Sequence, residues 1–184
     1  LDVCSGTGDM AGALARMAEA RVKIIGVDFC FPMLAQAVKK PEHSRISFCV
    51  SEAGSLPFAD NTFDVVTIAF AARNLNSSGQ DILLQCFREF RRVLKPGGRF
   101  INLETSQPKS ALLRKLVHFY IRLMVKPIGY LISGSKMAYG YLAHSIPRFF
   151  SAEELAGVMY RAGFKKIDFI LLSFGVAAVH IAVK

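Results

Sequence analysis

The sequence begins Leu1-Asp2-Val3-Cys4-Ser5-Gly6-Thr7-Gly8-Asp9, a short apolar run followed by two closely spaced glycines. Such a run is typical of the end of a buried strand, and the glycines let the backbone turn sharply and approach a ligand closely. An alanine-rich stretch over about 10–20 then predicts a helix. A strand, a glycine-rich turn and a helix in this order predict a cofactor at the carboxyl end of the first strand.

Strand and helix patterns alternate in the residues that follow. Strands are expected over 22–27, 46–50, 63–70 and 100–103, and helices over about 32–40 and 82–94. The run Pro96-Gly97-Gly98 is expected to end the second of these helices. Because this alternation is typical of a parallel sheet covered on both faces, we predict an α/β fold with a doubly wound, Rossmann-like sheet of five parallel strands.

The C-terminal third predicts a different arrangement. Ser151-Ala152-Glu153-Glu154 has the pattern of a capping box, which opens a helix that Gly163 closes. Two apolar runs, 167–172 and 176–183, are separated by a turn at Gly175 and pair most simply as an antiparallel hairpin. Five parallel strands with a C-terminal antiparallel hairpin differ from the usual dinucleotide-binding sheet.

Length and composition predict a single domain over residues 1–184, of which 52% are hydrophobic. Each apolar stretch falls short of the roughly 18 residues that a membrane-spanning helix needs. The four cysteines are scattered without metal-binding spacing, so we expect reduced thiols, a cytoplasmic protein and no metal site. The chain opens without Met in what resembles the middle of a strand, so we expect that an N-terminal segment is missing.

The formal net charge of +9 is unevenly distributed, because no Asp or Glu lies between Glu104 and Glu153. The basic residues of this stretch are Lys109, Arg114, Lys115, Arg122, Lys126, Lys136 and Arg148. They alternate with apolar residues over about 108–148, as in a lid helix, a helix on an anionic membrane surface or a nucleic-acid-binding helix. We favour the membrane surface over nucleic acid, since the aromatic residues are embedded in an aliphatic stripe.

Asp28 is the first candidate for a cofactor contact outside the glycine-rich turn. It follows the glycines by about twenty residues and ends the predicted second strand, where a carboxylate can bind both hydroxyls of a ribose. Gly6-x-Gly8-x-x-Ala11 with this carboxylate also fits a relaxed NAD-binding fingerprint. An NAD-dependent oxidoreductase and a tight turn without a ligand are therefore alternatives.

Three features favour S-adenosylmethionine over NAD. Glu52 and Ala53 follow the predicted third strand, where a polar group can face an adenine. Asp2 lies just ahead of the glycines, where a carboxylate suits the ammonium of adenosylmethionine and disfavours a pyrophosphate. The third feature is the run over 93–100, which leads into the fifth strand of a sheet that ends in a hairpin.

The run Arg92-Val93-Leu94-Lys95-Pro96-Gly97-Gly98-Arg99-Phe100-Ile101-Asn102-Leu103-Glu104-Thr105-Ser106 resembles the signature of the ubiquinone/menaquinone biosynthesis methyltransferase family. Further resemblance lies in Phe70-Ala71-Ala72-Arg73-Asn74-Leu75, Ala138-Tyr139-Gly140-Tyr141-Leu142 and Gly175-Val176-Ala177-Ala178-Val179-His180. The resemblance extends essentially over the whole chain. It implies a class I methyltransferase fold, S-adenosylmethionine as cofactor and C-methylation of a quinone precursor.

The resemblance also implies which residues contact the cofactor. Thr7, Asp28, Glu52 and Ala53 fall at cofactor-contacting positions, although Glu52 stands where Asn or Asp is commoner in the family. Ala69 stands where many relatives carry a cofactor-contacting Ser. The expected cofactor site therefore comprises Asp2, Gly6, Thr7, Gly8, Asp28, Glu52, Ala53 and Ala69. The missing N-terminal segment carries a further family signature and packs over the active site, so we expect activity to depend on it.

Methylation of a ring carbon is an in-line displacement at a sulfonium, which needs positioning, exclusion of water, a general base and a donor for the developing oxyanion. Arg73 is the candidate donor and Asn74 its support, while Tyr139 and His180 are candidates for proton transfer or ring contact. Further candidates are Tyr141, His144 and Glu104. The alternative is structural: Arg73 then pairs with a nearby carboxylate, and the Tyr and His side chains are buried with their hydrogen bonds satisfied.

The substrate implied by the family is a prenylated quinol. We favour demethylmenaquinol, with the 2-polyprenyl-6-methoxy-1,4-benzoquinol of the ubiquinone pathway as a close variant. Its tail stays in the membrane, which suggests that the basic segment binds the inner membrane surface peripherally. A homodimer is one possible assembly, and a non-catalytic protein that binds the cofactor is the alternative from another functional class.

Overall fold

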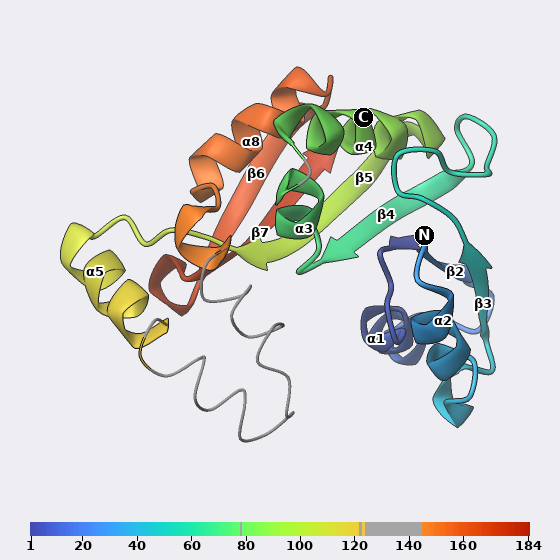
Figure 1. The fold of residues 1–184 in the computed structure, drawn as a ribbon. Coiled ribbons are helices and arrows are strands. Elements are labelled where there is room, and N and C mark those ends of the chain that lie inside the picture. Colours follow the sequence, from blue (N-terminus) through green and yellow to red (C-terminus); the bar gives the residue numbers. More distant parts are fainter. Residues whose placement is uncertain (78, 122, 124–144) are drawn as a thin grey trace.

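The described part of the chain builds one seven-stranded sheet. The computed structural model describes residues 1–77, 79–121, 123 and 145–184, and its strand order is β3-β2-β1-β4-β5-β7-β6 (Figure 1). The strands are β1 (Asp2–Val3), β2 (Ile24–Asp28), β3 (Ile46–Val50), β4 (Phe63–Ala69), β5 (Leu94–Thr105), β6 (Lys165–Leu172) and β7 (Ala177–Val183). The first five are parallel, and β7 lies antiparallel between β5 and β6. The predicted doubly wound α/β sheet with an antiparallel C-terminal pair is confirmed.

Helices cover both faces of this sheet. They include α1 (Asp9–Met17), α2 (Phe31–Ala37), α3 (Ala72–Ser77), α4 (Gln80–Val93), α5 (Ala111–Tyr120) and α8 (Ala152–Arg161). Ile24 of β2 packs with Ala11 and Ala15 of α1 on one face. Val27 of the same strand belongs to the larger core on the opposite face, which contains α4 residues. Alternate side chains of a strand point to opposite faces, so β2 is buried from both sides.

The larger core fixes α4 on the sheet. Leu83, Phe87 and Phe90 recur at helical spacing and are fully buried, as the apolar periodicity predicts. The ring of Phe100 on β5 lies 5.2 Å from that of Phe87 and 5.4 Å from that of Phe90 between centroids. Since a fully buried apolar side chain of this size contributes about 1.5–3 kcal/mol, the aromatic cluster holds α4 firmly against β5.

The end of α4 differs from the prediction. The helix ends at Val93 and β5 begins at Leu94, whereas the strand was expected to begin at Phe100. Pro96-Gly97-Gly98 lies inside the strand, where the pairing with β4 shifts register between Phe63 opposite Leu94 and Val65 opposite Arg99. Gly97 has a φ of 76°, a conformation that favours glycine. The three residues therefore form an irregularity within β5 and do not terminate the helix.

Other boundaries agree with the predictions more closely. The capping box is confirmed, because Ser151 N–H donates to Glu154 Oε2 at 2.8 Å and Glu154 N–H donates to Ser151 Oγ at 3.2 Å. Helix α1 ends at Met17, before the predicted residue 20, because the backbone of Ala18 is extended. The predicted hairpin corresponds to β6 and β7, which a 3-10 turn at Ser173–Gly175 connects.

The basic segment expected over about 108–148 is described only in part. It includes α5, whose N-cap Ser110 accepts a hydrogen bond from Leu113 N–H. The candidates Tyr139, Tyr141 and His144 lie outside the described residues, as do Lys126 and Lys136. Within the described ranges, every helix is too short or too polar to cross a membrane.

Candidate functional site

Two adjoining cavities open at the carboxyl ends of the parallel strands. The larger, of about 670 Å³, lies at the ends of β1, β4 and β5. The smaller, of about 390 Å³, extends towards the end of β3 and towards α4. Both are lined by Cys4, Asp28, Phe29 and Leu75. This is the edge of an open α/β sheet at which ligands bind, beside the point where the strand order reverses.

The glycine-rich turn forms one wall of the larger cavity. Gly6 and Gly8 have φ values of 54° and 81°, which only glycine adopts without strain. Gly6 N–H donates to Asp28 Oδ2 at 2.8 Å, so the turn is tied to the end of β2. Gly8 caps α1 and faces His43, and a Cβ atom there would lie 2.7 Å from the His43 ring. Gly8 therefore shapes the turn, while Gly6 and Thr7 line the cavity.

Asp28 occupies the junction of the two cavities. Only 6% of its surface is exposed, and its carboxylate accepts hydrogen bonds from Gly6 N–H and from Cys30 N–H, both at 2.8 Å. Each carboxylate oxygen has a second lone pair, so the side chain can also accept the two hydroxyls of a ribose. The position is therefore consistent with the predicted ribose contact.

Asp2 supplies a second buried carboxylate to the larger cavity. Its Oδ1 accepts a hydrogen bond from Thr67 Oγ1 at 2.7 Å, while its Oδ2 has no hydrogen-bond partner among the described residues. Only 1% of its surface is exposed, and burial raises the pKa of Asp2 to about 6, although the Thr67 hydroxyl opposes the shift. A buried carboxylate with one oxygen that lacks a hydrogen bond among the described residues is suited to a ligand cation, such as the ammonium group of S-adenosylmethionine.

This pKa predicts a pH-dependent affinity for S-adenosylhomocysteine, which carries the same ammonium group. In the free protein the Asp2 carboxyl is protonated below about pH 6, and a bound cation favours the carboxylate. Affinity is therefore expected to rise about tenfold from pH 5 to pH 7 and then to level off. Calorimetric titration across this range measures the effect, and Asp2→Asn should remove the pH dependence. A steep dependence that persists in Asp2→Asn would assign it to another group.

The remaining cofactor candidates divide between the two cavities. Ala69 lines the larger cavity, and Glu52 and Ala53 line the smaller one, opposite Ile82 and Gln85 of α4. The α4 residues were missed as lining residues, because Ile82 belonged to the apolar pattern of a core helix and Gln85 lay outside that pattern. Phe29 and Phe70, which are 73% and 49% exposed, were also missed as lining residues of the larger cavity. The sequence feature that could have identified them is an aromatic residue directly after the end of β2 and of β4.

Arg73 forms a buried ion pair beside the larger cavity. Its Nη1 lies 3.2 Å from Glu104 Oε1, and its backbone N–H donates to Glu104 Oε2 at 3.0 Å. Arg73 is 5% exposed and Glu104 is fully buried. This is the pairing that the alternative interpretation expected, and the role of Arg73 as an oxyanion donor stays a prediction. Asn74, the next residue, lines the larger cavity, whereas Arg73 and Glu104 lie behind its wall.

His180 lies away from both cavities. It sits on β7 opposite Asn102, is 1% exposed, and its Nε2 is 2.9 Å from the carbonyl oxygen of Ala152. Burial lowers the pKa of His180, so the neutral form is favoured. Its position does not support the predicted role in proton transfer or ring contact, because the side chain is turned towards α8 and not towards the site.

Comparison with known proteins agrees with this geometry. Residues 1–184 match the sequence profile of the ubiE/COQ5 methyltransferase family. The chain is 39% identical to a demethylmenaquinone methyltransferase of Lactiplantibacillus plantarum, over 100% of this chain and 77% of that protein. It is 41% identical to a ubiquinone/menaquinone biosynthesis C-methyltransferase of Rickettsia bellii, over 100% of this chain and 75% of that protein.

Solved structures share the fold at low sequence identity. A methyltransferase of Aquifex aeolicus, described as dependent on S-adenosylmethionine, superposes with a TM-score of 0.67 at 18% identity, covering 99% of this chain and 79% of that one. The [4+2]-cyclase SpnF superposes with a TM-score of 0.70 at 20% identity, covering 100% of this chain and 74% of the cyclase. Because proteins described as a methyltransferase and as a cyclase share the fold, the fold alone does not determine the reaction.

Proposed function

The chain belongs to the ubiE/COQ5 methyltransferase family, and from this premise we propose that it methylates a ring carbon of a prenylated quinol, in the first place demethylmenaquinol. It is an S-adenosylmethionine-dependent methyltransferase. The observation that carries the substrate assignment is similarity over 100% of this chain, at about 40% identity, to proteins named demethylmenaquinone methyltransferase. The benzoquinol of the ubiquinone pathway is the second candidate, because equally similar relatives are named for both pathways.

The buried carboxylates support the cofactor assignment. Asp28 would hold the ribose hydroxyls, and the unpartnered oxygen of Asp2 would receive the ammonium group. Glu52 and Ala53 would face the adenine in the smaller cavity. When bound, S-adenosylmethionine supplies an electrophilic methyl group on its sulfonium. A dinucleotide fits less well, because the Asp2 carboxylate would repel a pyrophosphate at the glycine-rich turn.

The protein's own part in methyl transfer is positioning and exclusion of water. Met33, Phe70 and Leu103 give the larger cavity an apolar lining, which suits an aromatic ring. Asn74 lines the same cavity and is the candidate for orienting a ring oxygen. The Arg73–Glu104 pair anchors the start of α3 to β5 and so fixes the position of Asn74.

A methylation assay with a short-tailed demethylmenaquinol, kept reduced, tests the proposal. We expect one methylated quinol for each S-adenosylhomocysteine formed, with lower kcat/KM for the benzoquinol of the ubiquinone pathway. Cofactor binding without methylation of either quinol, both by this chain and by a form extended with the N-terminal segment that the family resemblance implies, would instead favour the non-catalytic binding protein. Faster turnover of the benzoquinol would reverse the order of the two candidates.

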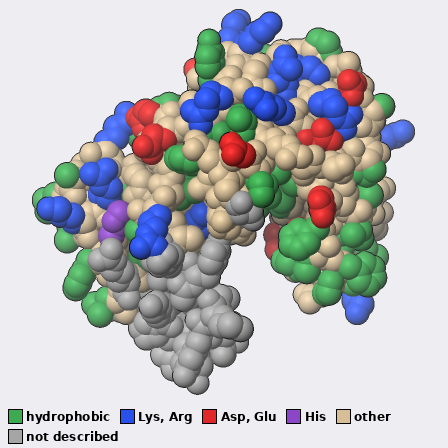
Figure 2. Space-filling model, turned by 45° about the horizontal axis from the view of Figure 1, so that its top comes forward, with side chains coloured by type: hydrophobic (Ala, Val, Ile, Leu, Met, Phe, Trp, Pro, Cys, Tyr) green, Lys and Arg blue, Asp and Glu red, His purple; other side chains and the backbone are tan. Residues whose placement is uncertain are grey.

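Peripheral binding to an anionic membrane surface is the second part of the proposal. Leu112, Leu116 and Phe119 lie on one side of α5 and are 70%, 57% and 64% exposed. Lys115 and Arg114 on the same helix are exposed, and the sequence holds no acid between Glu104 and Glu153. Around α5, basic and hydrophobic side chains gather at the surface (Figure 2). Such a helix can insert its apolar side among acyl chains while its cations meet lipid phosphates. A cytoplasmic location at the inner membrane surface and a homodimer remain predictions.

Leu116→Glu should weaken this contact without altering the site. Placing a charge in the apolar stripe costs at least about 1.5 kcal/mol at a membrane surface, so kcat/KM for a long-tailed quinol in anionic vesicles should fall about tenfold. Activity on a soluble short-tailed quinol should stay unchanged. Tyr160→Glu on α8, where the side chain is 74% exposed, is the matched control. Equal activity of both variants on vesicles would contradict the assignment of α5.

A further inference from the structure

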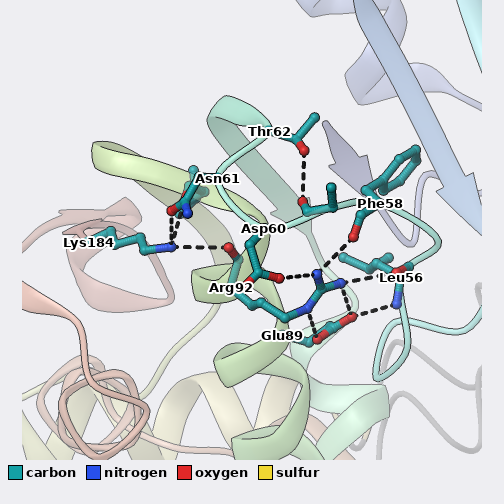
Figure 3. Close-up of polar contacts among 10 residues, drawn as sticks. Leu56, Phe58, Asp60, Asn61, Thr62, Glu89, Arg92 and Lys184 are labelled. Atoms are coloured by element: carbon teal, nitrogen blue, oxygen red, sulfur yellow. Dashed lines mark hydrogen bonds and ion pairs between the residues drawn. The ribbon is translucent and has the colours of Figure 1, made fainter.

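The guanidinium of Arg92 holds the loop that connects β3 to β4, residues 51–62 (Figure 3). Its Nη1 donates to the carbonyl oxygen of Phe58 at 2.8 Å and to Asp60 Oδ1 at 2.7 Å, and its Nη2 donates to the carbonyl oxygen of Leu56 at 3.1 Å. A single side chain thus binds residues 56, 58 and 60, which are alternate positions of one loop. A planar fork of donors can make this set of bonds, whereas the single ammonium of lysine cannot.

Glu89, which lies one helical turn before Arg92 on α4, also helps to attach the loop to this helix. Its Oε2 accepts Arg92 Nε–H at 2.8 Å, and its Oε1 accepts Arg92 Nη2–H and Leu56 N–H, both at 2.7 Å. The side chain of Glu89 is 14% exposed, so these charge-assisted bonds are partly shielded from water. The N–H and the carbonyl of Leu56 are therefore both fixed to α4, and its side chain is 5% exposed.

A second set of bonds anchors the far end of the loop. Asn61 N–H donates to the carbonyl oxygen of Arg92 at 3.1 Å, and Thr62 N–H donates to that of Val93 at 2.8 Å. Lys184 Nζ donates to Asn61 Oδ1 at 2.8 Å and to the carbonyl oxygen of Leu94 at 2.6 Å. With its far end fixed separately and Leu56 buried in the core, Glu89 and Arg92 supply the hydrogen bonds that join the middle of the loop to α4.

The middle of the loop leads directly into the smaller cavity. Glu52, Ala53, Gly54 and Ser55 precede Leu56 and form one wall, and α4 provides Ile82 and Gln85 for the opposite wall. On α4, positions 82, 85, 89 and 92 follow one another at intervals of three or four and therefore lie on one side of the helix. This side both lines the cavity and holds the loop. A Cβ atom on Gly54 would lie 3.6 Å from Gln85 Nε2, so the two walls are in close contact there.

We propose that Glu89 and Arg92 are positioning residues that set the separation of the two walls and thereby the affinity for the nucleoside half of S-adenosylmethionine. The inference rests on the proposed function, which places the adenine in the smaller cavity. Neither residue lines a cavity, and both act through Leu56 and the wall that precedes it. The methyl acceptor lies in the other cavity, so the clamp of Glu89 and Arg92 controls cofactor binding and not the transfer step.

Arg92→Lys tests the clamp, with Arg91→Lys as the matched control on the same helix. Arg91 Nε donates to the carbonyl oxygen of Gly163 at 2.8 Å, far along the chain from the loop. In Arg92→Lys, loss of two or more charge-assisted bonds should raise the Kd of S-adenosylhomocysteine about tenfold, and that of 5′-methylthioadenosine by the same factor. KM for S-adenosylmethionine should rise equally, while kcat at saturating cofactor stays at the wild-type value. Arg91→Lys should stay within about twofold of wild type.

Each result distinguishes the clamp from a merely structural role. A folded Arg92→Lys protein with wild-type Kd for both ligands overturns the proposal, as does a loss confined to kcat. Glu89→Gln keeps an acceptor for Leu56 N–H but loses the charge, so it should show a smaller rise in Kd, and an unchanged Kd there also counts against the clamp. Failure of the wild-type protein to bind S-adenosylhomocysteine would overturn the cofactor assignment itself, which is a different outcome from a variant without effect.

Discussion

Asp28→Ala is expected to raise the Kd for S-adenosylhomocysteine by at least about 100-fold, because two hydrogen bonds to a charged acceptor contribute about 3 kcal/mol or more. The carboxylate is lost from the junction of both cavities, and Gly6 N–H and Cys30 N–H lose their acceptor at the same time. The change therefore removes the ribose contact and loosens the glycine-rich turn. Isothermal titration calorimetry of the purified variant against the wild type measures the effect directly.

Two control variants separate these contributions. Asp28→Asn keeps one acceptor oxygen but directs an N–H₂ group at one of the two backbone donors, so it should fall between Ala and wild type. Asp168→Ala removes an exposed carboxylate from β6 on the far side of the sheet and should bind normally. Wild-type affinity in Asp28→Ala would show that the ligand does not contact this end of β2.

Much of the fold was predictable because burial leaves a periodic pattern. The near-continuous apolar run of β4 and the helical spacing of Leu83, Phe87 and Phe90 each identify an element without knowledge of its partners. The path of β5 was not predictable in the same way. Pro96-Gly97-Gly98 is compatible with a helix end and with an irregular strand, and only the pairing with β4 selects the second.

The candidate site was predictable where it is local in sequence. The glycine-rich turn and Asp28 lie on consecutive elements, so their meeting follows from the parallel strand order. His180 was misplaced because alternation along β7 gives two faces and does not tell which one meets the site. The pairing of Arg73 with Glu104 joins residues 31 positions apart, and the clamp on the β3–β4 loop joins residues more than 30 positions apart. Contacts between side chains at such separations along the chain can be identified only from the folded structure.

Arg73→Ala is expected to lower the free energy of unfolding by about 3–5 kcal/mol, the usual cost of removing one partner of a buried ion pair. Glu104 is fully buried, and without the guanidinium its remaining hydrogen-bond donors among the described residues are the backbone N–H of residue 73, Thr105 N–H and Thr105 Oγ1. Urea unfolding followed by circular dichroism measures the loss. A change below about 1 kcal/mol would mean that the pair is open to water in solution.

The double variant Arg73→Met with Glu104→Gln separates stability from catalysis. It removes both charges and keeps one acceptor oxygen for Thr105 N–H, but its N–H₂ group faces the backbone N–H of residue 73, so it should recover part of the stability lost in Arg73→Ala. If Arg73 contributes only by anchoring α3, the double variant should methylate the quinol within about tenfold of the wild-type kcat. If its Nε, which has no partner among the described residues, turns to the substrate oxyanion, kcat should fall by about 100-fold or more in a protein that is folded and binds the cofactor normally. Because the comparison is made in protein that is folded and binds the cofactor, the remaining change in kcat reports the contact between Arg73 and the reacting ring.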